Sequence, residues 1–162
     1  MSDPFKLTYD YIWAVAERQS AIQSLVKGSK IKYNRDVPAL EVLRSGDTPE
    51  LALKPIGGEW PIQGNSHTTK LVPRWQWLVT TGTLKPETMF SLWWGLTRAL
   101  YQLSKTRSEL TFENKPLIER IDSVSNEAAD EVSRQQRSVK GWISILTFET
   151  TLQVPNSSLT AD

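Results

Sequence analysis

The sequence predicts an α+β domain: an antiparallel β-sheet with two main helices packed on one face. Apolar residues repeat with strand or helix periods in the order helix, short strand, strand, helix, strand, strand. The strands outnumber the helices and occur in successive pairs, which favours an antiparallel sheet over a parallel one. The two clearest strands, 71–81 and 142–154, each place their large apolar side chains on one parity, so one sheet face needs a cover.

The first predicted element is a helix over 5–27. Asp3 is a suitable N-cap, and Pro4 suits the first helical turn. Apolar residues then recur at helical spacing along the segment, with some drift after its middle. Gly28 is a typical stop signal, so we expect a single helix that ends there.

The next segments predict little regular structure. Residues 30–50 contain two prolines and one glycine, which exclude a long element, although 39–44 can form one or two helical turns. Residues 51–56 predict a short strand, which Pro55 restricts to an edge or an end of the sheet. Residues 57–69 have the composition of a loop, and their length predicts a projecting arm or flap.

The stretch 71–103 carries the strongest pattern in the chain. Trp75 and Trp77 share the apolar parity of the strand, and we expect both in the core. Pro86 and Glu87 suit the first turn of a helix over 86–104. Pro86 has a fixed φ close to the helical value, and the negative charge of Glu87 lies at the positive end of the helix dipole. The apolar stripe that should cover the sheet comprises Met89, Leu92, Trp93, Leu96, Ala99, Leu100 and Leu103.

The remaining third of the chain predicts two further strands. The residues that follow Pro116 alternate as a strand, and 142–154 form the second clear strand. Between them, 126–138 are dense in charge and predict a second projecting loop or a hairpin tip. Pro155 ends the last strand, and 156–162 predict a flexible tail. We therefore expect one domain over 1–162, with a core over about 5–155.

Composition excludes several classes of protein. Nineteen basic and 18 acidic residues give a formal net charge of +1, which argues against a protein that grips nucleic acid by its phosphates. The absence of cysteine excludes disulfides and thiolate chemistry. We expect no signal peptide, because the first residues lack a basic region before an apolar core. No apolar run is long enough to span a membrane.

The sequence offers little for catalysis. The only histidine, His67, falls in a polar loop, and no ligand spacing predicts a metal site. Gly57 and Gly58 lack the Lys-Ser/Thr that follows in a phosphate-binding loop. Mixed charges over 126–138 are typical of a solvated surface. We therefore expect no catalytic, cofactor-binding or metal-binding residues, and no enzyme activity.

A second aromatic stripe follows the predicted helix 86–104. Phe90, Trp94 and Tyr101 are four and seven residues apart, rotated away from the stripe that faces the sheet. Two interpretations stay open. The helix is sandwiched between the sheet and the N-terminal helix, or the stripe is a candidate subunit interface. In the second case Trp94→Ser should weaken assembly and leave the monomer folded, whereas Trp93→Ser should unfold the chain.

The order of motifs resembles that of the tail-terminator and tail-completion proteins of tailed bacteriophages. The residues that carry the resemblance are the helical N-terminus, the strand and turn Trp75-Gln76-Trp77-Leu78-Val79-Thr80-Thr81-Gly82, the helix with Leu96, Ala99 and Leu100, Pro116-Leu117-Ile118, and Gly141-Trp142 leading to Val154-Pro155. The resemblance implies a virion structural protein assembled in the host cytoplasm, commonly as a hexameric ring at the neck. Such a ring caps the tail tube, joins it to the head-side connector, and lets DNA pass without tight binding.

Two other functions remain open from the sequence. One is another head–tail adaptor or stopper protein on a related scaffold. The other, from a different class, is a small ligand-binding domain or enzyme with a pocket between helix and sheet. A ring favours the head–tail joining functions, and a stable monomer favours the ligand-binding domain.

The charge balance makes a prediction about DNA. We expect at most weak binding to duplex DNA at physiological salt, because no basic stripe accompanies the near-zero net charge. Fluorescence anisotropy with a labelled duplex, repeated at several salt concentrations, measures this. A submicromolar affinity that falls steeply with salt would contradict it.

Overall fold

The computed structural model describes residues 3–35, 49–60, 67–81, 86–134 and 137–160, with the backbone alone at 80–81, 123, 127–134 and 137–144. The helices are α1 (Pro4–Glu17), α2 (Ser20–Lys27), α3 (Pro86–Thr106), the 3₁₀ turn η2 (Arg107–Glu109) and α4 (Asn156–Thr160). The strands are β1 (Lys32–Asn34), β2 (Glu50–Glu59), β3 (Thr68–Thr81), β4 (Thr111–Phe112), β5 (Lys115–Pro116), β6 (Ile118–Arg134) and β7 (Arg137–Pro155).

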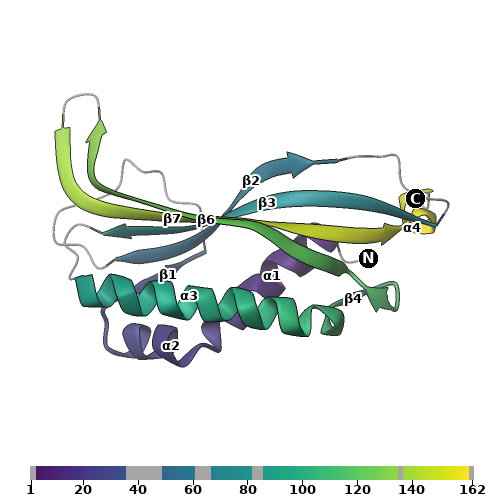
Figure 1. The fold of residues 1–162 in the computed structure, drawn as a ribbon, viewed down its shortest axis with the longest axis horizontal. Helices are drawn as coiled ribbons and strands as arrows, with labels where there is room; N and C mark the ends of the chain where they lie inside the picture. Colours follow the sequence, from purple (N-terminus) through teal and green to yellow (C-terminus); the bar gives the residue numbers. More distant parts are fainter. Residues whose placement is uncertain (1–2, 36–48, 61–66, 82–85, 135–136, 161–162) are drawn as a thin grey trace.

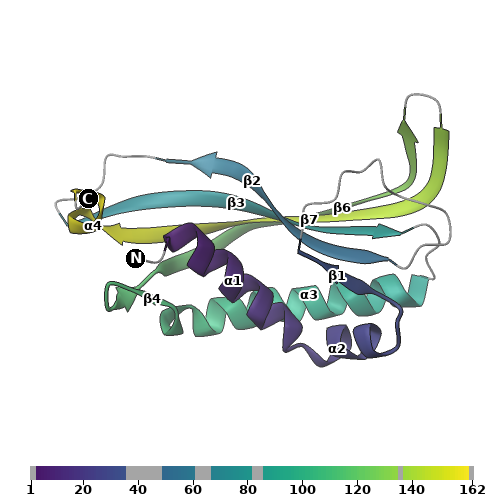
Figure 2. The ribbon, with the colours of Figure 1, turned by 180° about the vertical axis from the view of Figure 1, so that it is seen from behind.

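Five strands form one sheet in the order β1-β2-β3-β7-β6, and α1, α2 and α3 lie on one of its faces (Figures 1 and 2). The predicted α+β class is confirmed. The pairing is antiparallel except that the short strand β1 runs parallel to β2. β4 and β5 form a separate two-stranded hairpin. Among the described residues, no helix is both long and apolar enough to cross a membrane.

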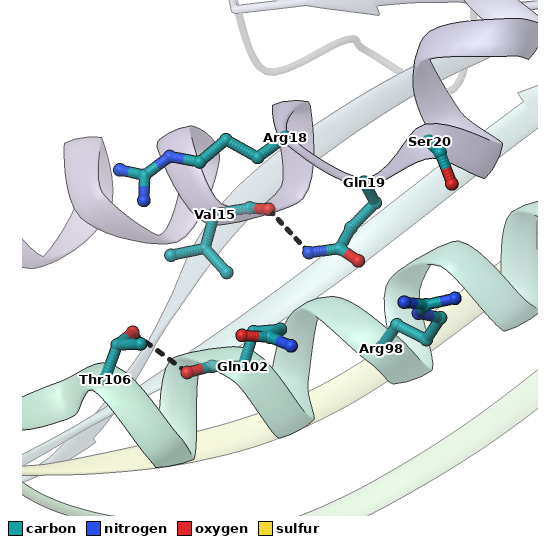
Figure 3. Close-up of a pocket in the computed structure, with 7 residues that line it drawn as sticks. All are labelled: Val15, Arg18, Gln19, Ser20, Arg98, Gln102 and Thr106. Carbon is teal, nitrogen blue, oxygen red and sulfur yellow. Dashed lines mark hydrogen bonds between the residues drawn. The ribbon is translucent and has the colours of Figure 1, made fainter.

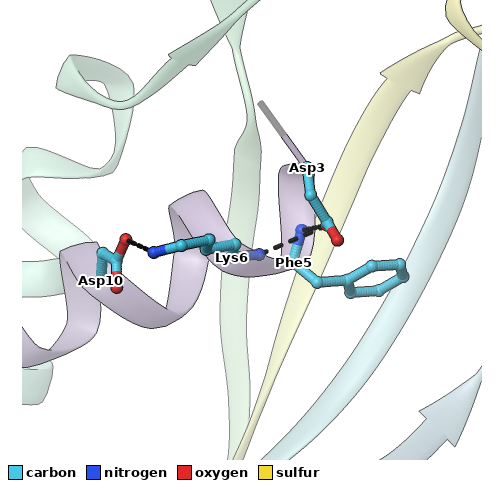
Figure 4. Close-up of polar contacts among 4 residues, drawn as sticks. All are labelled: Asp3, Phe5, Lys6 and Asp10. Carbon is cyan, nitrogen blue, oxygen red and sulfur yellow. Dashed lines mark hydrogen bonds and ion pairs between the residues drawn. The ribbon is translucent and has the colours of Figure 1, made fainter. Parts of the chain in front are cut away.

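The start of α1 follows the sequence prediction. The carboxylate of Asp3 accepts hydrogen bonds from the backbone N–H of Phe5 at 2.7 Å and of Lys6 at 3.3 Å (Figure 4). These bonds satisfy two of the N–H groups that a helix leaves without an internal partner. One turn further on, Lys6 pairs with Asp10 at 2.7 Å on the exposed side.

The single helix predicted over 5–27 is wrong, because the chain breaks at Arg18 and Gln19. Gln19 has an extended backbone, with ψ at 126°, and starts the separate helix α2. The break lets α2 turn onto α3, where Ile22 is fully buried. A Cβ on Gly95 would lie 2.7 Å from the Ile22 side chain, so this glycine permits the close contact.

The pair β3 and β7 is the middle of the sheet. The two strands are antiparallel, as predicted, with Trp75 opposite Phe148 and Trp77 opposite Leu146. All four side chains are buried beneath the helices. The Trp75 indole N–H donates to the Thr150 hydroxyl at 2.9 Å, which satisfies a polar group inside the core.

Strand β2 is longer than predicted and occupies part of the expected 57–69 loop. It reaches Glu59 through a bulge between Pro55 and Gly58. β1 pairs only with the first three residues of β2, so Pro55 lies where β2 is an edge strand, as its missing N–H requires. At the other end, burial raises the pKa of the Glu50 carboxyl, but hydrogen bonds from Asn34 and Lys32 on β1 outweigh it and lower the pKa.

Of the two forms predicted for 126–138, a projecting loop or a hairpin tip, the structure has the hairpin, and most of the segment is strand. β6 continues to Arg134 and β7 begins at Arg137, and the two pair throughout this hairpin apart from bulges. β3 pairs with β7 only as far as Thr81 opposite Trp142, so the distal hairpin extends beyond it. Figure 1 shows this arm bending away from the helices. Cross-strand hydrogen bonds stabilise a charged segment that has no strong apolar pattern of its own.

The tail predicted as flexible over 156–162 forms α4 in its described part. The Asn156 N–H donates to the His67 carbonyl at 2.9 Å, and the Thr69 hydroxyl donates to the Asn156 side chain at 2.7 Å. These bonds hold the end of β7 against the start of β3, so the chain stays ordered beyond Pro155. The helical turn expected at 39–44 lies outside the described residues.

The bulge in β2 makes a prediction about two adjacent glycines. Gly58 has φ +144°, and an added Cβ would lie 2.1 Å from the Val72 carbonyl oxygen. Gly57 also has a positive φ, +97°, but its Cβ would meet nothing within 4 Å. Gly58→Ala should therefore lower the free energy of unfolding by about 3 kcal/mol, combining backbone strain with a steric clash. Gly57→Ala should cost about 1 kcal/mol from strain alone.

Urea unfolding of both variants measures the difference. Equal losses would show that β2 moves away from β3 at Val72 without cost, contrary to the observed packing.

Candidate assembly surface

Helix α3 presents two opposite faces. Met89, Leu92, Leu96 and Leu103 are almost completely buried under the sheet. On the reverse of the helix, the aromatic stripe, defined as Phe90, Trp94 and Tyr101, is 59%, 60% and 61% exposed. At 3.6 residues per turn these three positions lie within a narrow arc of the helix surface. Large aromatic side chains gathered on an exposed arc are typical of an interaction surface.

No element of the described chain covers the aromatic stripe. The N-terminal helices pack on another side of α3: α2 contacts it at Gly95, and the Tyr11 hydroxyl of α1 donates to the Thr106 carbonyl at 2.9 Å. The alternative in which α3 is sandwiched, with its second stripe under the N-terminal helix, is therefore not what the structure shows. A subunit interface at the stripe remains a prediction.

Trp93 differs from the core position predicted for it. Its side chain is only partly buried and packs against the edge of the core, with its ring centroid 5.9 Å from that of Phe90. Trp93 therefore lies at the boundary between the buried face of α3 and the aromatic stripe. By contrast, Trp75 and Trp77 are confirmed as core residues, at 2% and 1% exposed.

Cations border the aromatic stripe. The Lys105 ammonium lies 5.4 Å from the centroid of the Tyr101 ring, within reach of a cation–π interaction. Arg98 is four residues after Trp94 and three before Tyr101, so it neighbours both on the helix surface. Trp, Tyr and Arg are the residue types most enriched among those that dominate binding energy at protein interfaces.

A groove of about 310 Å³ lies beside this surface, between α3 and the corner where α1 meets α2 (Figure 3). Its lining residues are Val15, Arg18, Gln19, Ser20, Arg98, Gln102 and Thr106. The lining contains neither a carboxylate nor a histidine, so the groove has no general base or metal ligand. It lies between helices, whereas the ligand-binding alternative placed a pocket between helix and sheet.

The other face of the sheet carries paired charges. Two nitrogens of the Arg74 guanidinium contact the Glu149 carboxylate, at 2.9 and 2.8 Å. Lys70 pairs with Glu119 at 3.2 Å across strand β7. Arg120 pairs with Asp122 along β6 at 2.5 Å. In each of these pairs a carboxylate offsets a cation, which weakens the field that this face presents to a polyanion.

The described residues contain no group of three or more His, Cys, Asp or Glu side chains placed to hold a metal ion. His67 lies just before β3 and contributes its backbone carbonyl to the contact with Asn156. Gly57 and Gly58 belong to β2 and its bulge, so they shape the strand edge. The prediction that the chain is not an enzyme is compatible with this geometry and remains a prediction.

Comparison with known proteins identifies the fold. No protein-family model matches the sequence, and no curated protein sequence matches it. Among solved structures, a chain from the virion of a native gene transfer agent (GTA) particle has a similar structure, with a TM-score of 0.52 and 12% sequence identity. The similarity covers 88% of this chain and 92% of that one. At this identity the match establishes a common fold over nearly the full length of both chains.

Substitution of Trp93 and of Trp94 should change the stability of the subunit by different amounts. Trp93→Ser should lower the free energy of unfolding by about 2 kcal/mol, because a partly buried indole loses its contacts with the core. Trp94→Ser should change it by less than about 0.5 kcal/mol, since its side chain is 60% exposed. Thermal and urea unfolding, followed by circular dichroism at a concentration where the chain is monomeric, measures both. A loss at Trp94 as large as that at Trp93 would show that Trp94 belongs to the core.

Proposed function

We propose that this chain is a structural protein of a virion, and more specifically the tail-terminator or tail-completion subunit of a tailed phage-type particle. The observation that carries the proposal is the fold shared, along nearly the whole of both chains, with a virion component. The resemblance in motif order, from the Trp75–Gly82 strand and turn to Val154-Pro155, supports the specific assignment. In this function the subunits form a ring, commonly a hexamer, that caps the tail tube and meets the head-side connector.

The aromatic stripe supports assembly into such a ring. A Trp side chain has about 200 Å² to bury, and Trp94 is 60% exposed, so an interface can remove about 120 Å² of it from water. At about 25 cal/mol per Å², this contributes roughly 3 kcal/mol before the entropic cost of association. A ring repeats each contact once per subunit, so a modest contribution from Phe90, Trp94 and Tyr101 stabilises the whole assembly.

The charge-paired sheet face suits the lumen of such a ring. The wall of a passage for DNA should not bind the phosphates, because each Lys or Arg side chain that pairs with a phosphate would slow the movement of the DNA. On this face Arg74 and Lys70 are neutralised by Glu149 and Glu119, so a wall built from it attracts DNA only weakly. This arrangement agrees with the weak DNA binding predicted from net charge.

Two other functions compete with this proposal. A head–tail adaptor or stopper uses the same kind of assembly, and it differs in the component that each ring face meets. A ligand-binding domain or small enzyme needs no assembly, and the described groove lacks the groups for acid–base chemistry. Measurement of the oligomeric mass separates this second alternative from the head–tail joining functions.

The proposal predicts that Trp94→Ser weakens assembly without unfolding the subunit. We expect wild-type protein to form a ring, alone or on purified tail tubes, and Trp94→Ser to raise the concentration needed for it at least about tenfold. Analytical ultracentrifugation and negative-stain electron microscopy measure mass and shape. Trp60→Ser is the matched control, since Trp60 is also exposed, at 44%, but lies at the end of β2, away from α3.

Two results would contradict the proposal. A wild-type chain that stays monomeric and does not bind tail tubes would favour the ligand-binding alternative. A ring that binds only head-side connectors, and never the tube end, would favour the adaptor or stopper.

A further inference from the structure

The described arginine side chains fall into two groups: those that contact another group of this chain and those that do not. The guanidiniums of Arg35, Arg74 and Arg120 each contact a carboxylate of this chain. Arg107 donates to two backbone carbonyls, at 2.8 and 2.6 Å. Arg18 and Arg98 are the two arginines whose guanidiniums have no partner among the described residues, and both line the groove between α1, α2 and α3.

The two guanidiniums lie on opposite sides of the groove (Figure 3). Arg18 extends along the end of α1, and Arg98 rises from α3 toward Gln19 and Ser20. The amides of Gln19 and Gln102 lie between them, and Gln19 is fixed by its hydrogen bond to the Val15 carbonyl at 3.1 Å. The groove is thus bordered by two cationic forks, with amide and hydroxyl groups between them.

The first turn of α2 adds to this positive field. No side chain caps the helix at Gln19, and the first turn contains no acidic residue. The partial positive charge of the helix start is therefore not neutralised locally. This contribution is smaller than that of the two guanidiniums, because a helix start carries only a partial charge.

The surroundings of the groove favour a protein ligand over DNA. Arg98 joins the groove to the aromatic stripe, since Trp94 and Tyr101 are its neighbours on α3. Residue types that are common in protein interfaces therefore border the groove. A duplex would need a longer row of cations to contact successive phosphates, and this chain has a net charge of only +1.

We propose that the groove between Arg18 and Arg98 binds an acidic segment of a partner protein, with one carboxylate of the segment at each guanidinium. Guanidinium forks match carboxylates in a bidentate geometry, which makes such pairs specific as well as attractive. The site depends on the groove itself and does not require that the chain be a tail terminator. If the chain proves not to be a tail terminator, the prediction that the groove binds an acidic segment still holds.

Binding of a blocked tetraglutamate peptide to the 162-residue chain tests the site. We expect the peptide to shift the NMR signals of the Arg18 and Arg98 side chains, with an affinity that falls as salt is raised. Arg18→Gln and Arg98→Gln should each weaken binding by about fivefold, the scale of one exposed ion pair, and the double variant should weaken it further. Arg98→Lys should retain part of the affinity, because it keeps the charge but loses the fork.

The controls separate this site from general charge attraction. Arg120→Gln removes one exposed positive charge from a different face and should leave the affinity unchanged. A blocked tetraglutamine peptide should not bind. All five variants change exposed side chains, and thermal unfolding should confirm that each folds as the wild type does.

Three outcomes would overturn the proposal. The first is equal binding of tetraglutamate to wild type and to the double variant. The second is tighter binding of a short DNA duplex than of tetraglutamate, lost in the double variant, which would identify a phosphate site. The third is self-association of the wild type that the double variant abolishes, which would make the occupant a second copy of this chain.

Discussion

The antiparallel pairing of β3 with β7 is the constraint on which the rest of the structure depends. It aligns Trp75 and Trp77 with Phe148 and Leu146 on one face and creates a broad apolar surface. Trp13 of α1 meets Trp77 edge-on, with ring centroids 4.9 Å apart. Neither of these two indole N–H groups has an acceptor among the described residues. The contact therefore derives from the burial of aromatic surface and not from hydrogen bonding.

Helices must bury that apolar surface, and the way in which α3 does so explains why its aromatic stripe is exposed. One face of α3 packs on the sheet, and a second side packs on α2, which can approach closely because residue 95 is a glycine. The face opposite the core is left with three large aromatic side chains and nearby cations. A helix that served only to close a monomer would gain nothing from aromatic residues in water, so their position supports a role in assembly.

The distribution of charge gives the surfaces different properties although the whole chain is nearly neutral. On the open face of the sheet, cations lie beside carboxylates and their fields largely cancel. In the groove between the helices, neither Arg18 nor Arg98 forms an ion pair with a carboxylate of the described residues. The sum of charges thus describes the affinity for a long polyanion, whereas the local arrangement decides where one acidic side chain can bind.

The sequence alone determined the elements whose patterns are local. Alternation over 71–81 and the 3.6-residue period over 86–104 survive in the structure, because each element buries one face and exposes the other. The same period separates the aromatic stripe from the buried face of α3, whereas the packing of α1 and α2 decides that the stripe is exposed. Tertiary contacts decided what local patterns could not. The break at Arg18 and Gln19 contains neither proline nor glycine, and it follows from the packing of α2 on α3. The strand pairing over 126–134 and 137–138 depends on hydrogen bonds between β6 and β7. The groove brings together Arg18 and Arg98, which no periodicity relates.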